Sequence, residues 1–257
     1  VEEDLSDQLV FLQELHALAA TMDTTAALDS VMVLLENDPD VLWAANVRTG
    51  VNVEYKTGLR GFLVLQLGGR ELPTAATGLP PRPSFHEPTP AAACLSAAEE
   101  RSSLYTVPKH RRTVYLAPAF SEFRTWDQSV LDAANAALPR IGYEPFTVLK
   151  NEQLTLATLR TVSSGDYGIV LISSHGAPWP SEETIEEVYL LTGESSTPYA
   201  DSVNAAYLQN GTVGVTSYFG QNLYSVNVRY FSDHNDFQDA QPLMLLGFCF
   251  GYLGDWP

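Results

Sequence analysis

The sequence predicts an α/β protein: a three-layer α-β-α arrangement with a mostly parallel sheet, and a small α+β region at the N-terminus. Two observations support this prediction. Strand-like apolar runs alternate with helix-like segments between residues 112 and 173, which is typical of a parallel sheet whose crossovers are helices. The chain has 257 residues, of which 45% are hydrophobic and 18% charged, so it can bury a substantial core.

The N-terminal region, residues 1–72, is expected to form a helical pair followed by a β-hairpin. Leucines recur at helical spacing between residues 5 and 22, and a second helix is expected over residues 24–35. Residues 51–67 alternate around a Thr-Gly turn, which predicts the hairpin. The sequence leaves three roles open for this region: a pro-region that covers a substrate-binding crevice of the following domain, a docking module, or part of a neighbouring domain.

Residues 73–111 are expected to be a linker. The segment is rich in Pro, Ala and Ser and has almost no large apolar residues, a composition that cannot form a packed core by itself. Cys94 lies in this segment and is interpreted as a bystander.

Residues 112–257 are expected to form the main α/β domain. Its first elements, in order, are a strand at 112–118, a helix at 127–142, a strand at 144–150, a helix at 154–165 and a strand at 166–173.

The segment 182–240 is less regular. Residues 188–194 read as a strand, and two stretches, 210–220 and 223–232, are expected to be exposed strands or a hairpin arm. A final apolar strand is expected over residues 243–246.

Two reactive side chains follow two of these apolar strands. His175 and Gly176 come directly after the strand at 166–173, and Cys249 follows the last strand. In an open parallel sheet, ligands bind outside the carboxyl ends of the strands. If the two strands are neighbours, both side chains reach one crevice.

The chemistry that follows is acyl transfer by a thiolate. An imidazole activates a thiol by taking its proton, which makes Cys249 the candidate nucleophile and His175 the candidate base. The backbone N–H groups of Gly176 and Cys249 are candidates for an oxyanion hole. Three alternatives stay open: Cys249 as a core thiol, His175 as a structural histidine, and a His/Cys metal site, which lacks further ligands at known spacing.

The Ser173-Ser174-His175-Gly176 run and the later Gly247-Phe248-Cys249-Phe250-Gly251 run, in this order of elements, resemble the caspase-like fold of caspases, gingipains, clostripain, legumain and CHAT domains. The resemblance covers about residues 112–257, and residues 51–65 and 227–237 weakly resemble bacterial exported proteins that have this domain. It implies a cysteine endopeptidase with His175 as general base and Cys249 as nucleophile.

The sequence departs from this group in three ways. Phe248 stands where many members have a small or acidic residue, and the long separation of His175 from Cys249 implies an inserted arm near residues 195–235. The sequence also ends soon after Cys249, which leads to the expectation of a C-terminal truncation, with a second chain or a cleaved C-terminal fragment as partner.

Substrate-binding residues are expected in two loops. The resemblance places the group that binds the P1 side chain in residues 119–127, where Glu122 would favour a basic residue and Arg124 an acidic one; Glu122 is preferred, and both also fit a solvent-facing position. Trp179, just past His175, is a candidate for lining the cleft, with simple packing as the alternative.

Charge narrows the range of partners. Lys and Arg total 14 against 31 Asp and Glu, a net charge of −17, which argues against nucleic acid and anionic membranes. No apolar run is long enough to span a bilayer. We therefore expect a peptide or protein substrate, no cofactor, no metal and an extracytoplasmic location. The alternative is an inactive caspase-like scaffold that binds a partner through its acidic face or the aromatic side chains of the 195–235 arm.

Overall fold

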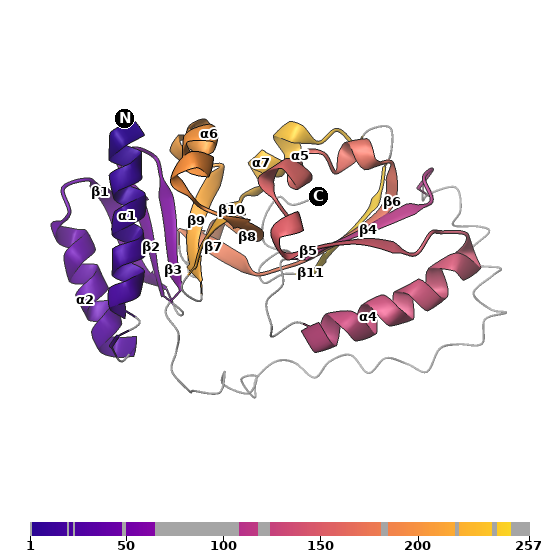
Figure 1. The fold of residues 1–257 in the computed structure, drawn as a ribbon, viewed down its shortest axis with the longest axis horizontal. Coiled ribbons are helices and arrows are strands. Elements are labelled where there is room, and N and C mark those ends of the chain that lie inside the picture. The colour runs from indigo at the N-terminus through magenta and orange to yellow at the C-terminus, as the bar shows by residue number, and fades with distance from the viewer. Residues whose placement is uncertain are drawn as a thin grey trace.

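The computed structural model describes residues 2–19, 21–22, 24–47, 50–64, 108–117, 124–180, 185–218, 221–237 and 241–247. Within these residues the chain forms helices packed on two β-sheets (Figure 1). The α/β class is confirmed. The strands, however, divide between a parallel sheet of four strands and a separate mixed sheet of seven, whereas the sequence predicted one mostly parallel sheet.

All strand pairs of the four-stranded sheet are parallel, and its order is β11-β6-β4-β5. Its strands are β4 (Arg112–Ala117), β5 (Phe146–Lys150), β6 (Tyr167–Ser173) and β11 (Leu243–Gly247). The chain moves outward from β4 to β5 and then returns past β4 to β6, so the winding reverses between β4 and β6. Ligands of doubly wound sheets bind at such a reversal, outside the carboxyl ends of the strands.

Helices α4 (Arg124–Ala137) and α5 (Leu156–Arg160) connect these strands. Alternate residues of β4 point to opposite faces: Tyr115 packs with Leu131 of α4, whereas Leu116 joins the core cluster that contains α5. Figure 1 shows α4 on one side of this sheet and α5 with α7 (Val228–His234) on the other.

The seven-stranded sheet has the order β1-β2-β3-β9-β10-β8-β7. Its strands are β1 (Val41–Val47), β2 (Gly50–Tyr55), β3 (Arg60–Val64), β7 (Gly176–Pro180), β8 (Ile185–Ser195), β9 (Val213–Tyr218) and β10 (Gln221–Val226). All pairs are antiparallel except β3 with β9. The predicted hairpin is β2–β3.

One face of the seven-stranded sheet is apolar and is covered by helices. Besides α7, these are α1 (Glu2–Ala19), α2 (Thr24–Asn37) and α6 (Pro198–Gln209). Leucines of α1 and the buried residues Ala27, Val31 and Leu35 of α2 pack with strand residues such as Val53 and Val215 in one cluster. The same cluster includes Val114 and Val170 of the other sheet. The two sheets therefore share a core. Short 3₁₀ helices lie at Leu138–Ile141, Asn151–Gln153 and Ser163–Gly165.

The two stretches expected at 210–220 and 223–232 do form a hairpin, β9–β10, but this hairpin is not an exposed arm. β9 and β10 lie inside the seven-stranded sheet, because β9 pairs with β3 on one side and β10 with β8 on the other. Tyr224, Tyr230 and Phe231 are completely or almost completely buried, so these three aromatic rings serve packing and are not free to form an interface. Tyr199 of α6 is exposed.

The N-terminal strands and the strands after His175 belong to the same sheet. The boundaries 1–72, 73–111 and 112–257 stay a prediction, but they do not separate one sheet from another. The segment 73–107 and residues 248–257 lie outside the described residues.

Candidate active site

The strands that carry the two candidate catalytic residues are direct neighbours. β6 and β11 run parallel, with Leu243 opposite Ile169 and Gly247 opposite Ser173. The carboxyl ends of the two strands therefore lie at the same level. His175 comes two residues after Ser173, and Cys249 two residues after Gly247. This adjacency is what a shared site requires, although Cys249 itself lies outside the described residues.

The backbone around His175 is bound to both sheets. The N–H of Ser174 donates to Gly247 O at 3.3 Å, at the end of β11, and its hydroxyl donates to Leu191 O in β8 at 2.7 Å. The N–H of Leu191 in turn donates to His175 O at 3.0 Å. His175 is half-buried and Ser174 is buried. The histidine thus stands where the chain passes from the parallel sheet into the mixed one.

Gly176 is the first residue of β7 and pairs with Leu190 of β8. It is half-buried and lies next to the carboxyl end of β6. Its role as an oxyanion donor stays a prediction.

Trp179 is 3% exposed, and its packing explains its position. Its indole makes edge-to-face contacts with Trp43 at 5.3 Å and with Phe62 at 5.5 Å between ring centres, and the guanidinium of Arg60 lies 4.7 Å from its ring centre. The structure thus supports the packing alternative for Trp179 and gives no support to a place in the cleft wall.

The remaining substrate-binding candidates are the two residues considered for the P1 side chain. Glu122 lies outside the described residues, and Arg124 is the first residue of α4. Their part in recognising a P1 side chain stays a prediction.

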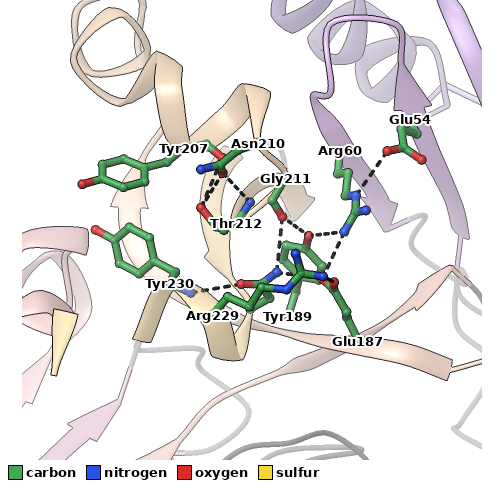
Figure 2. Close-up of polar contacts among 11 residues, drawn as sticks. Glu54, Arg60, Glu187, Tyr189, Tyr207, Asn210, Gly211, Thr212, Arg229 and Tyr230 are labelled. Atoms are coloured by element: carbon green, nitrogen blue, oxygen red, sulfur yellow. Dashed lines mark hydrogen bonds and ion pairs between the residues drawn. The ribbon is translucent and has the colours of Figure 1, made fainter. Parts of the chain in front are cut away.

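A second polar cluster, which sequence analysis missed, joins β3 to β8 (Figure 2). Arg60 donates through Nη1 to Glu187 Oε2 at 3.0 Å and to the Tyr189 hydroxyl at 2.8 Å. Glu187 also accepts from Asn227 at 2.7 Å and from Arg229 at 2.5 Å. Charged residues on two distant strand-like segments gave no sign of this contact, because the sequence does not show that β3 and β8 share a sheet.

Arg60 and Tyr189, the two groups of this cluster whose pKa values are shifted, both stay protonated at neutral pH. Burial raises the pKa of Tyr189 above its ordinary value, so its hydroxyl stays protonated. Burial opposes the charge of Arg60, but the adjacent Tyr189, Glu187 and Glu54 outweigh it and raise the pKa of the guanidinium. The arrangement fits a structural role better than acid–base catalysis.

An apolar cavity of about 300 Å³ lies at the opposite, amino end of β11. Its lining residues are Phe237, Gln241, Pro242, Leu243 and Met244. None of these side chains is nucleophilic or ionisable, so the cavity contributes no chemistry to the carboxyl end of the sheet.

In the part of the chain that the structure describes, no group of three or more His, Cys, Asp or Glu side chains is arranged to hold a metal ion. Among the same residues, no helix is both long and apolar enough to cross a membrane.

The arrangement defines a class of site: a histidine at the carboxyl end of one strand of a parallel sheet, beside a strand that leads to a cysteine. Comparison of the chain with models of known families, with curated proteins and with solved structures finds no match.

Proposed function

We propose that the protein is a cysteine endopeptidase of the caspase-like, three-layer type, in which Cys249 is the nucleophile and His175 the general base. The observation that carries the proposal is the in-register parallel pairing of β6 with β11. It brings the carboxyl ends of the two strands to one edge of the sheet. The strand order β5-β4-β6-β11 adds support, because the reversal between β4 and β6 opens toward the same edge.

In the proposed reaction, His175 takes the proton of the Cys249 thiol, and the thiolate attacks the scissile carbonyl carbon. The backbone N–H groups of Gly176 and Cys249 stabilise the oxyanion of the tetrahedral intermediate. His175 returns the proton to the amine as the C–N bond breaks, which leaves a thioester on Cys249. Water, deprotonated by His175, then hydrolyses the thioester and restores the thiol.

The substrate in this proposal is a peptide or protein cut outside the cytoplasm. With a net charge of −17, the protein would attract cationic chains. Glu122 is the candidate for binding a basic P1 side chain.

The test uses the small number of cysteines in the chain. Cys94 and Cys249 are its two cysteines, so the Cys94→Ala variant leaves Cys249 as the single thiol. We expect iodoacetamide to alkylate this thiol with a pH midpoint well below the ordinary value of about 8.5. His175→Gln in the same background should return the midpoint to about 8.5.

The matched control is His110→Gln. His110 lies before the amino end of β4, away from the carboxyl ends of the strands, so its replacement should leave the midpoint unchanged. In parallel, Cys249→Ala should abolish hydrolysis of a casein or arginine-containing peptide library that the Cys94→Ala variant still cleaves. The proposal would be refuted if Cys249 in the Cys94→Ala variant were alkylated with a midpoint of about 8.5. It would also be refuted if Cys249→Ala hydrolysed the peptides as fast as the native protein.

A further inference from the structure

Side chains from the N-terminal strands of the seven-stranded sheet contact β7, the strand at its other end. β7 is the last strand in the sheet order and β2 the second, so four strands lie between them along the ladder. Nevertheless, the Nδ2 amide of Asn52 in β2 donates to Pro178 O at 2.9 Å and to Pro180 O at 2.7 Å in β7. The sheet therefore curls until β2 faces the open edge of β7.

The contact matches the chemistry of that edge. β8 lies on one side of β7, and there the carbonyl of His175 accepts from Leu191. The carbonyls of Pro178 and Pro180 are not used by β8 and accept from Asn52 instead. Prolines offer no N–H, so this edge presents acceptors at both positions. A primary amide has two N–H groups, and Asn52 uses one on each carbonyl.

A second set of contacts holds the same strand from the N-terminal segment. Trp179, between the two prolines, packs against Trp43 of β1 and Phe62 of β3, and Arg60 lies against its ring. Asn52 is itself buried. Thus β7, which begins one residue after His175, is fixed by β8 on one edge and by residues of β1–β3 on the other.

We propose that Asn52 is a positioning residue that holds β7 and, through it, places His175 for its role at the carboxyl edge of the parallel sheet. This inference rests on the proposed function of His175 as the general base. The N-terminal segment would then help to position the general base, whereas a pro-region would block the active site.

Two variants test the inference in the Cys94→Ala background. Asn52→Leu keeps the approximate volume and removes both donors, whereas Asn52→Ser keeps one donor on a smaller side chain. Asn46→Asp on the neighbouring strand β1 is the control, because Asn46 is exposed. The first readout is hydrogen exchange of the Leu191 amide, which donates to the carbonyl of His175. The second is the alkylation rate of Cys249 at pH 6.5, and urea unfolding reports global stability.

We expect the Leu191 amide to exchange at least tenfold faster in Asn52→Leu, beyond the change that global stability explains, with a smaller increase in Asn52→Ser and none in Asn46→Asp. Alkylation of Cys249 at pH 6.5 should slow by about tenfold in Asn52→Leu.

Each other outcome has a distinct meaning. Unchanged exchange at Leu191 overturns the inference. Faster exchange with unchanged alkylation, in a protein where His175→Gln does slow alkylation, also overturns it and leaves the proposed function standing. If His175→Gln itself has no effect on alkylation, the proposed function fails; the exchange of Leu191 then decides whether Asn52 holds the backbone of His175.

Discussion

Gly247 and Ser174 connect the carboxyl end of the parallel sheet to the chain that crosses into the mixed sheet: the Ser174 N–H donates to the Gly247 carbonyl at 3.3 Å. The Ser174 hydroxyl continues this link to Leu191 O at 2.7 Å. One buried serine therefore bonds both sheets at the residue before His175, which leads to the first prediction.

Ser174→Ala should destabilise the protein by about 1–2 kcal/mol, because it removes a buried hydrogen bond and leaves a buried carbonyl without this donor. Ser232→Ala is the matched control. The Ser232 hydroxyl donates to Arg229 O on the exposed surface of α7, so its loss should change stability by no more than about 0.5 kcal/mol. Urea unfolding followed by circular dichroism measures both, and equal effects would contradict the prediction.

The two arginines that bind Glu187 should differ greatly in their contribution to stability. Arg60 is 19% exposed and also contacts Tyr189 and Trp179, whereas Arg229 is 64% exposed. We expect Arg60→Met to cost about 3 kcal/mol, as for loss of one partner of a buried ion pair. Arg229→Met should cost at most about 1 kcal/mol, as for a surface pair. Denaturant unfolding of both variants checks this, and a reversed order would be inconsistent with the geometry in Figure 2.

Deprotonation of Asp201 should lower the free energy of unfolding as the pH rises through the acid range. Burial raises the pKa of its carboxyl above the ordinary 3.8, even though Tyr224 and Ser196 donate hydrogen bonds to it. Between these two pKa values the folded state holds a proton that the unfolded state has released, so this contribution to stability is present below pH 3.8 and is lost as the pH rises through the folded pKa.

The Asp201→Asn variant removes this titration. The stability of the variant relative to the native protein should therefore increase as the pH rises through that window and stay constant above it. Thermal unfolding from pH 3.5 to 7.5 measures the difference. A difference that does not change with pH would contradict the role assigned to Asp201.

Cutting the chain between the N-terminal strands and β4 should leave one particle. A protease site inserted after residue 85 divides the chain into pieces that share the β3–β9 pairing, the Arg60–Glu187 ion pair and the contacts of Asn52 with β7. The two pieces should elute together in size-exclusion chromatography and separate after denaturation. Separation without denaturant would show that residues 1–72 are an independent module.

Local patterns predicted the parallel sheet well. β4, β5, β6 and β11 lie where apolar runs indicated strands. The two central strands, β4 and β6, are largely buried, as continuous apolar segments of a parallel sheet usually are. The adjacency of β6 and β11 followed from a hypothesis about chemistry. Nothing in the sequence placed the two strands side by side.

The mixed sheet was missed because its pairings are distant in sequence. β7, with its two prolines, has no apolar alternation, and β1 was overlooked. α6 was also missed, since its pattern is reversed: Tyr199 and Val203 are exposed, whereas Asp201 and Asn204 are buried. Periodicity indicates a buried face only when apolar residues occupy it.

The parallel pairing of β3 with β9 has a consequence for synthesis. Gly61 pairs with Val215, so the first strands leave the ribosome long before the strand that completes their edge. At ordinary translation rates this delay is on the order of ten seconds. During that time the nascent hairpin exposes an unpaired edge, the kind of surface at which chains aggregate before folding is complete.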